Sequence, residues 1–79
     1  MKKFIFMKPA EKYIDKQPAQ EASRLLLAIY KLPKGNIEKL QNWDGAFRLR
    51  VGGVRVIFEM DGNRITVCDI DNRGDVYKG

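Results

Sequence analysis

The sequence has no histidine and one cysteine, Cys68, among its 79 residues. Without histidine, the chain cannot supply a catalytic triad, a proton shuttle or a metal site built on imidazole groups. One cysteine excludes an intramolecular disulfide bond and a zinc site made from cysteines. Any catalysis by this chain must therefore use arginine, lysine, tyrosine, aspartate or glutamate.

Long apolar segments are also missing from the sequence. No stretch approaches the roughly 20 apolar residues that a membrane span requires. The apolar run Phe4–Met7 follows Lys2 and Lys3, as in a signal peptide, but it is too short for the apolar part of one. We therefore expect a soluble, cytoplasmic protein with no membrane partner.

Acidic residues are the minority among the charged ones. The chain has 10 Asp and Glu against 15 Lys and Arg, which gives a net charge of +5. This excess favours a polyanionic partner, either nucleic acid or an acidic protein. At 79 residues and 44% apolar content, the chain is expected to form one small globular domain.

The first half of the chain predicts a strand followed by two helices. Phe4–Met7 is expected to form the strand, and Pro9 and Pro18 each stand where a helix can begin. The second helix is predicted over 18–32, because apolar residues recur there at helical spacing. These residues are Ala22, Leu25, Leu26, Ile29 and Leu32. Such a stripe is typical of a helix that packs on a sheet.

The second half changes to the two-residue period of strands. After an expected polar loop over 34–45, apolar residues alternate with arginines in FRLRVGGVRVIF, residues 47–58. Gly52-Gly53 predicts one hairpin turn and Asp61-Gly62 a second, of type I′. Residues 72–79 can add a short final strand. The order β-α-α-β-β-β predicts an α+β fold, with the N-terminal strand and a two-helix hairpin on an antiparallel sheet.

The first hairpin predicts an arginine-rich face on the sheet. Pairing through Gly52-Gly53 places Arg50 opposite Arg55, with Arg48 alongside and all three pointing away from the helices. Like charges directly opposite each other destabilise a sheet. A guanidinium group binds phosphate well, because its planar fork donates two parallel hydrogen bonds. The register therefore indicates a phosphate-binding site.

The second hairpin is expected to leave these arginines without counter-charges directly across from them. With Asp61-Gly62 as its turn, Glu59 faces Arg64 and Arg55 faces Cys68. Arg55 would then have no carboxylate directly across on either neighbouring strand. An arginine face without counter-charges favours a bound anion.

Two residues of the following segment, Arg73 and Tyr77, can reach the same face. Arginine stays protonated, so it stabilises charge that develops on a phosphate and does not serve as a base. Tyr77 can stack on a nucleobase or take part in proton transfer. This set allows metal-free RNA cleavage through the RNA 2′-hydroxyl, and it equally allows binding without cleavage.

Three segments resemble the RelE/ParE toxin superfamily, on its RelE side. They are LPKGNIEKL (32–40), FRLRVGGVRVIFEM (47–60) and ITVCDIDNRGDVYK (65–78). The elements R-x-R, G-x-R-V-I-[FY] and R-x-x-[VI]-Y occur in this order within them. The resemblance covers most of the chain and implies that residues 1–79 form one RelE-like toxin domain.

The resemblance also implies a function. RelE-type proteins are toxins of type II toxin-antitoxin pairs that cut mRNA in the ribosomal A site, with no metal or other cofactor. The expected partners are then a cognate antitoxin, which wraps the toxin and covers its site, and the ribosome with its mRNA. The toxin-antitoxin complex would be oligomeric and the isolated toxin a monomer.

Site residues follow from the same resemblance. The expected catalytic residues are Arg50, Arg55, Arg73 and Tyr77, and the expected RNA-binding residues are Arg48, Arg50, Arg55 and Lys78. Arg55 would stabilise the transition-state phosphate. Arg73 would act on the phosphate or the leaving group, and Tyr77 would stack on or orient a base.

The chain departs from the family pattern at two positions. Arg50 stands where a studied type of member has a lysine proposed as general base, and Asn72 stands where many members have histidine. The resemblance therefore assigns no general base. Two alternatives stay open: a catalytically attenuated module that only binds its antitoxin, and a ParE-like inhibitor of DNA gyrase.

Overall fold

One strand and two helices form the N-terminal half of the protein. The computed structural model describes residues 2–72 and places β1 at Lys3–Phe6, α1 at Lys8–Asp15 and α2 at Ala19–Tyr30. Pro9 lies in the first turn of α1 and Pro18 is the N-cap of α2, so each helix begins within one residue of its proline, and α2 ends two residues before the predicted position 32. In the described part of the chain, no helix combines the length and apolar character needed to cross a membrane.

Four strands follow the helices and complete a five-stranded sheet. They are β2 at Asn36–Lys39, β3 at Ala46–Val51, β4 at Val54–Asp61 and β5 at Arg64–Asp71. The order across the sheet is β1-β5-β4-β3-β2, with β1 parallel to β5 and the other neighbours antiparallel. The predicted α+β class is confirmed. The sheet is mixed, however, because no hairpin joins β1 to β5 and forces the two to run in opposite directions.

The segment 34–45 was expected to be a polar loop, but it contains the short strand β2. Within it, the half-buried Ile37 pairs with Leu49 of β3. A four-residue strand with one apolar side chain shows too little alternation to be recognised from sequence. The final strand that we expected over 72–79 falls on a segment that, apart from Asn72, lies outside the described residues.

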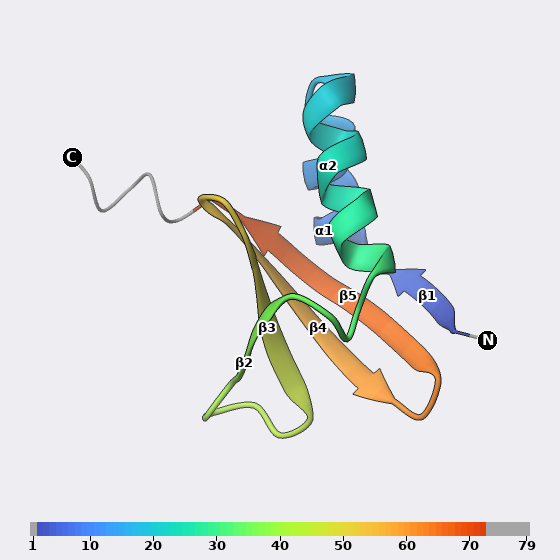
Figure 1. The fold of residues 1–79 in the computed structure, drawn as a ribbon, viewed down its shortest axis with the longest axis vertical. Coiled ribbons are helices and arrows are strands. Elements are labelled where there is room, and N and C mark those ends of the chain that lie inside the picture. Colours follow the sequence, from blue (N-terminus) through green and yellow to red (C-terminus); the bar gives the residue numbers. More distant parts are fainter. Residues whose placement is uncertain (1, 73–79) are drawn as a thin grey trace.

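The core lies between the two helices and one face of the sheet (Figure 1). The predicted stripe on α2 is confirmed, since Leu25, Ile29 and the following Leu32 are almost completely buried. From the sheet, the buried side chains include Leu49, Val56, Phe58, Ile65, Val67 and Ile70. Because side chains alternate along a strand, the arginines next to these apolar residues lie on the face away from the helices.

The β3–β4 hairpin has the predicted register. Val51 pairs with Val54 across the turn, and Arg50 pairs with Arg55. Gly52 has a φ of 62°, a left-handed conformation that favours glycine. The two-residue glycine turn therefore fixes the like-charge pair directly opposite each other.

The β4–β5 hairpin differs from the prediction in its turn. Asp61 pairs with Arg64, so Gly62 and Asn63 form the two-residue turn in place of Asp61-Gly62. Only Gly62 has a positive φ, 61°, as in a type II′ turn that begins with glycine. Glu59 consequently faces Thr66, and the expected pairing of Glu59 with Arg64 is wrong.

A β-bulge shifts the pairing register between β4 and β5 by one further residue. Phe58 pairs with Val67 but Ile57 pairs with Asp69, so Cys68 is the extra residue of β5. Beyond the bulge, Arg55 faces Asp71 and not Cys68. The turn and the bulge together bring a carboxylate to an arginine that was expected to lack one.

Candidate nucleic-acid interface

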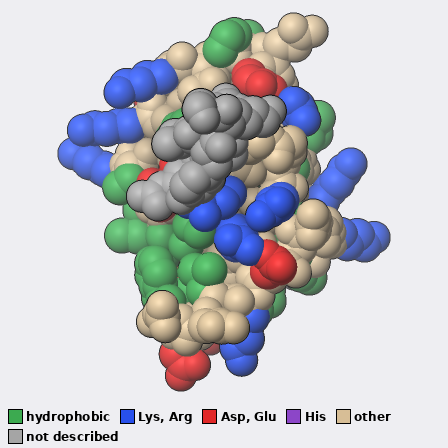
Figure 2. Space-filling model, turned by 90° about the vertical axis from the view of Figure 1, so that its left-hand side faces the viewer, with side chains coloured by type: hydrophobic (Ala, Val, Ile, Leu, Met, Phe, Trp, Pro, Cys, Tyr) green, Lys and Arg blue, Asp and Glu red, His purple; other side chains and the backbone are tan. Residues whose placement is uncertain are grey.

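Three arginines lie on neighbouring strands of the sheet face away from the helices. Arg48 and Arg50 come from β3 and Arg55 from β4, with Arg50 and Arg55 directly paired. On the side of the molecule shown in Figure 2, Lys and Arg side chains gather near the centre with an acidic side chain beside them. We call Arg48, Arg50 and Arg55 the arginine face.

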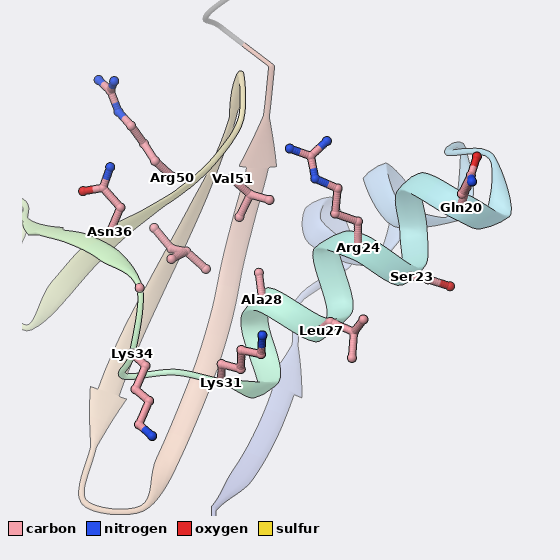
Figure 3. A pocket seen from close by; sticks show the side chains of 12 residues that line it. Gln20, Ser23, Arg24, Leu27, Ala28, Lys31, Lys34, Asn36, Arg50 and Val51 are labelled. Carbon is pink, nitrogen blue, oxygen red and sulfur yellow. The ribbon is translucent and has the colours of Figure 1, made fainter.

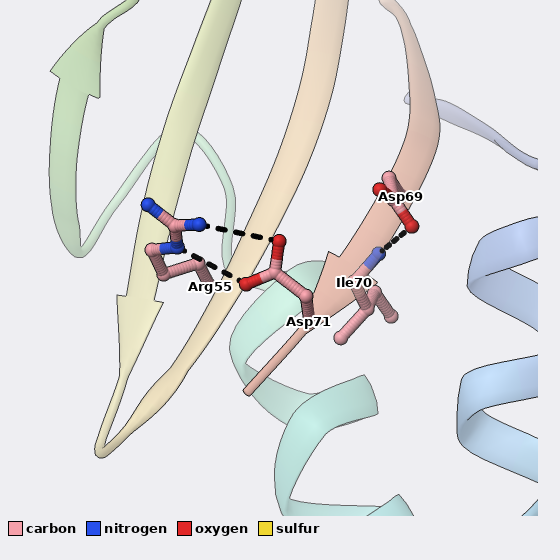
Figure 4. Close-up of polar contacts among 4 residues, drawn as sticks. All are labelled: Arg55, Asp69, Ile70 and Asp71. Atoms are coloured by element: carbon pink, nitrogen blue, oxygen red, sulfur yellow. Dashed lines mark hydrogen bonds and ion pairs between the residues drawn. The ribbon is translucent and has the colours of Figure 1, made fainter. Parts of the chain in front are cut away.

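Arg55 is held by Asp71 through two contacts. Its Nε donates to Oδ1 at 3.1 Å and one terminal nitrogen, Nη2, donates to Oδ2 at 3.3 Å (Figure 4). The two side chains are 25% and 31% exposed, so water screens the pair only partly. The prediction that Arg55 lacks a carboxylate across from it is therefore wrong.

Arg48 also has a carboxylate partner. Its Nη2 forms an ion pair with Glu38 of β2, the residue directly opposite in the β2–β3 register. The Nε of Arg48 is buried and has no hydrogen-bond acceptor among residues 2–72. Glu38 therefore neutralises the outer end of the side chain, while the stem of Arg48 is enclosed by the sheet.

Arg50 is the exception on the arginine face. Its side chain is exposed, and it forms no salt bridge within the part of the chain that the structure describes. Its neighbours across the strands are the neutral Asn36 and the like-charged Arg55. Arg50 is thus the arginine of this face most open to an incoming anion.

The remaining predicted site residues, Arg73, Tyr77 and Lys78, lie outside the described residues. Their roles stay predictions from the sequence. The sequence reasoning missed the ion pairs that Glu38 and Asp71 form with Arg48 and Arg55. Glu38 lay in an expected loop, and the bulge at Cys68 hid Asp71, so no simple alternation pointed to either residue.

Cys68, the extra residue at the bulge of β5, has a buried thiol. It is 7% exposed, and its Sγ donates to the backbone carbonyl of Thr66 at 3.6 Å. Burial raises the pKa of the Cys68 thiol above its ordinary value, and the negative charge of Glu59 adds to the shift. The thiol is therefore held in its protonated, unreactive form, as expected for a packing residue.

A groove lies next to the arginine face, between α2 and the β2–β3 edge (Figure 3). It encloses about 530 Å³, and every charged residue that lines it is basic: Arg24, Lys31, Lys34 and Arg50. Apolar side chains of Leu27, Ala28, Leu49 and Val51 also line it. Leu27 is 62% exposed, which leaves an apolar surface between the cations.

Comparison with known proteins assigns the fold. No family model and no curated protein matches this chain. A chain of the RelB-RelE antitoxin-toxin complex from Methanococcus jannaschii superposes with a TM-score of 0.73 at 23% identity, covering 94% of this chain and 95% of that one. A chain of the archaeal RelE-RelB complex from Pyrococcus horikoshii OT3 gives 0.72 at 20% identity, covering 92% and 96%.

A third similar structure is the YoeB dimer from Staphylococcus aureus, with a TM-score of 0.64 at 22% identity, covering 86% of this chain and 92% of that one. The fold defined by β1, the helix pair and the remaining strands is therefore an α+β fold with a mixed five-stranded sheet. More specifically, it is the RelE-like fold, as the resemblance of the sequence implied.

Proposed function

We propose that this protein is the toxin of a type II toxin-antitoxin pair, with residues 1–79 as its toxin domain, and that it cuts mRNA in the ribosomal A site in the cytoplasm. The observation that carries the proposal is the direct pairing of Arg50 with Arg55 on a RelE-like fold. A like-charge cross-strand pair lowers the stability of the sheet, and a bound phosphate can supply the counter-charge that Arg50 lacks within residues 2–72.

The proposed chemistry uses the 2′-hydroxyl of the RNA itself. Its oxygen attacks the neighbouring phosphorus and releases its proton to water, an O2′–P bond forms, the P–O5′ bond breaks, and the departing 5′-oxygen takes up a proton from water. Arg50 holds the phosphate, and Arg55 stabilises the negative charge that grows on its oxygens. Arg48 and Lys78 contact the RNA backbone, Arg73 acts on the phosphate or leaving group, and Tyr77 orients a base.

The test is expression without an antitoxin, with mRNA 5′ ends mapped on translating ribosomes. We expect in-frame cuts at the A site that disappear in Arg55→Ala and decrease strongly in Arg73→Ala. Arg64→Ala is the matched control, because Arg64 is an exposed arginine of the β4–β5 hairpin whose only ion pair in the described part is with Asp61 at 3.7 Å.

Two other results would replace the proposal by its alternatives. Growth arrest with intact mRNA and damaged DNA would identify a gyrase inhibitor. No growth effect, with tight antitoxin binding retained, would identify an attenuated binding module. The second alternative gains weight from one observation, the ion pair that already occupies Arg55.

The proposed partner is an antitoxin with an acidic segment that also carries apolar side chains. The groove beside α2 suits such a segment, since its basic rim attracts carboxylates and Leu27 offers an apolar contact. Binding there reaches Arg50, so it would compete with RNA. The free toxin is proposed to be a monomer and the complex a larger oligomer.

The position of this partner can be tested with one matched pair of variants. Leu27→Glu places a negative charge in the groove and is expected to weaken antitoxin binding about tenfold or more, which corresponds to about 1.4 kcal/mol. Met60→Glu makes the same change at a 36% exposed residue of β4 outside the groove lining. Calorimetry that finds both variants equally affected would place the antitoxin elsewhere.

A further inference from the structure

The contact between Arg55 and Asp71 has the geometry of anion binding. Two nitrogens of one guanidinium, Nε and Nη2, donate to the two oxygens of one carboxylate (Figure 4). A phosphate presents a pair of oxygens to arginine in the same parallel arrangement. Asp71 therefore occupies one of the two edges of Arg55 on which a phosphate can bind in this way.

The other ion pairs of the described residues are weaker competitors for their arginines. Glu38 is 59% exposed and contacts Arg48 through one nitrogen, and Asp61 lies 3.7 Å from an exposed Arg64. Glu21 is 40% exposed and contacts Arg24, which is 58% exposed, through one nitrogen at 3.3 Å. Asp71 is 31% exposed and makes two hydrogen bonds to Arg55. Water and salt screen the exposed pairs more strongly, so the pair at Arg55 is the best preserved of the four.

We propose that Asp71 is a positioning residue that restrains Arg55 and competes with the RNA phosphate for it, an inference that rests on the proposed function. In the free protein Asp71 holds the guanidinium in place. When RNA binds, the phosphate takes over the Nε and Nη2 edge, and the carboxylate turns away from it. No covalent bond changes in this exchange.

The exchange favours RNA that is already held in position. A free strand must displace Asp71 with the contact energy of one phosphate, so its binding is weakened. A strand anchored by other contacts, beginning at the exposed Arg50, presents its next phosphate at a high effective concentration. Asp71 thus weakens the binding of RNA that has no other contacts, because its carboxylate competes with the RNA phosphate for Arg55.

The test follows Arg55 directly while an anion is added. The Nε–H resonance of Arg55 is recorded by NMR in the full chain during titration with inorganic phosphate. In Asp71→Asn, we expect half-saturation at a phosphate concentration several-fold to about tenfold lower than in the wild type. Asp71→Glu keeps the carboxylate and is expected to stay close to the wild-type midpoint.

Asp61→Asn is the matched control for net charge, because it removes one exposed carboxylate at the far end of the same hairpin. We expect it to change the midpoint less than twofold. Equal midpoints in Asp71→Asn and Asp61→Asn, or a higher midpoint in Asp71→Asn, would overturn the inference. Asp71→Ser repeats the measurement if the asparagine variant does not fold.

The same variants separate this inference from the proposed function. Binding of a single-stranded RNA with 2′-O-methyl groups, which cannot be cut, is expected to become several-fold tighter in Asp71→Asn. If the proposed mRNA cleavage fails, the shift in the phosphate midpoint still shows the competition. If cleavage is found but the midpoint is unchanged, only the role of Asp71 is wrong.

Discussion

At the scale of single residues, counter-charges distinguish the three arginines of the arginine face. Arg48 and Arg55 are ion-paired with Glu38 and Asp71, whereas Arg50 has no such pair within residues 2–72. An arginine with a half-buried carboxylate partner contributes to folding, and an exposed arginine beside another arginine does not. The same face therefore contains residues with opposite effects on stability.

Replacement of Arg50 and Arg55 by alanine should separate these effects. Arg50→Ala is expected to leave the free energy of unfolding unchanged or to raise it by about 0.2–1 kcal/mol, because a like-charge pair disappears. Arg55→Ala is expected to lower it by about 1 kcal/mol, because Asp71 loses its partner in a partly buried place. Urea denaturation measures both values. An equal loss in the two variants would contradict the assignment.

Cys68 provides a prediction that depends on pH. Its thiol pKa is raised in the folded protein, mainly by burial, so the unfolded chain releases this proton first as the pH rises. The thiol therefore contributes its stability below the ordinary thiol pKa and loses it as the pH rises through the folded value. We expect the free energy of unfolding to fall between pH 8 and about 10 more steeply in wild type than in Cys68→Ala. Parallel slopes in urea denaturation would disprove this role.

At the scale of elements, the two hairpins show what sequence patterns can and cannot predict. The β3–β4 register was predicted correctly, because Gly52-Gly53 stands between two regular alternating segments. The β4–β5 turn was misplaced by one residue, because Asp-Gly and Gly-Asn overlap in the sequence and both are hairpin signals. Local preference does not choose between them when both are present.

The glycines of the first turn give a prediction at this scale. Gly52 has a positive φ of 62°, whereas Gly53 is not among the glycines with positive φ. Alanine at position 52 is therefore strained and is expected to lower stability by about 1 kcal/mol or more, whereas Gly53→Ala should be neutral or slightly stabilising. Thermal unfolding of the two variants compares them directly, and the reverse order would show that the turn has another conformation.

The candidate site was predicted in part, for reasons that particular residues make clear. Alternation placed Arg48, Arg50 and Arg55 on one face, and the structure confirms that arrangement. Asp71 was missed because a bulge adds one residue to β5, and a bulge depends on how the whole sheet twists and packs. A short polar edge strand such as β2 is likewise fixed by its neighbour β3 and not by its own residues.

At the scale of the whole molecule, two basic surfaces lie next to each other on a chain with a net charge of +5. The arginine face and the basic groove beside α2 meet at Arg50, which belongs to both. A polyanion that binds one surface therefore changes the field at the other. This continuity gives a physical reason for an acidic partner to exclude RNA, whichever of the two surfaces it contacts first.

Salt dependence measures how many charges the RNA contacts. For single strands, the logarithm of the binding constant falls with the logarithm of salt concentration by about 0.7 for each phosphate neutralised, so the three arginines of the arginine face together contribute roughly −2 to the slope. Arg50→Ala is expected to make the slope shallower by about 0.7. Arg64→Ala removes an equal charge at the start of β5, away from the arginine face, and should leave the slope unchanged. Fluorescence anisotropy of a labelled uncleavable RNA between 50 and about 300 mM salt measures these slopes.

Equal slopes for wild type and Arg50→Ala would mean that Arg50 does not contact the RNA backbone. A shallower slope in Arg64→Ala would mean that the RNA also runs along β5.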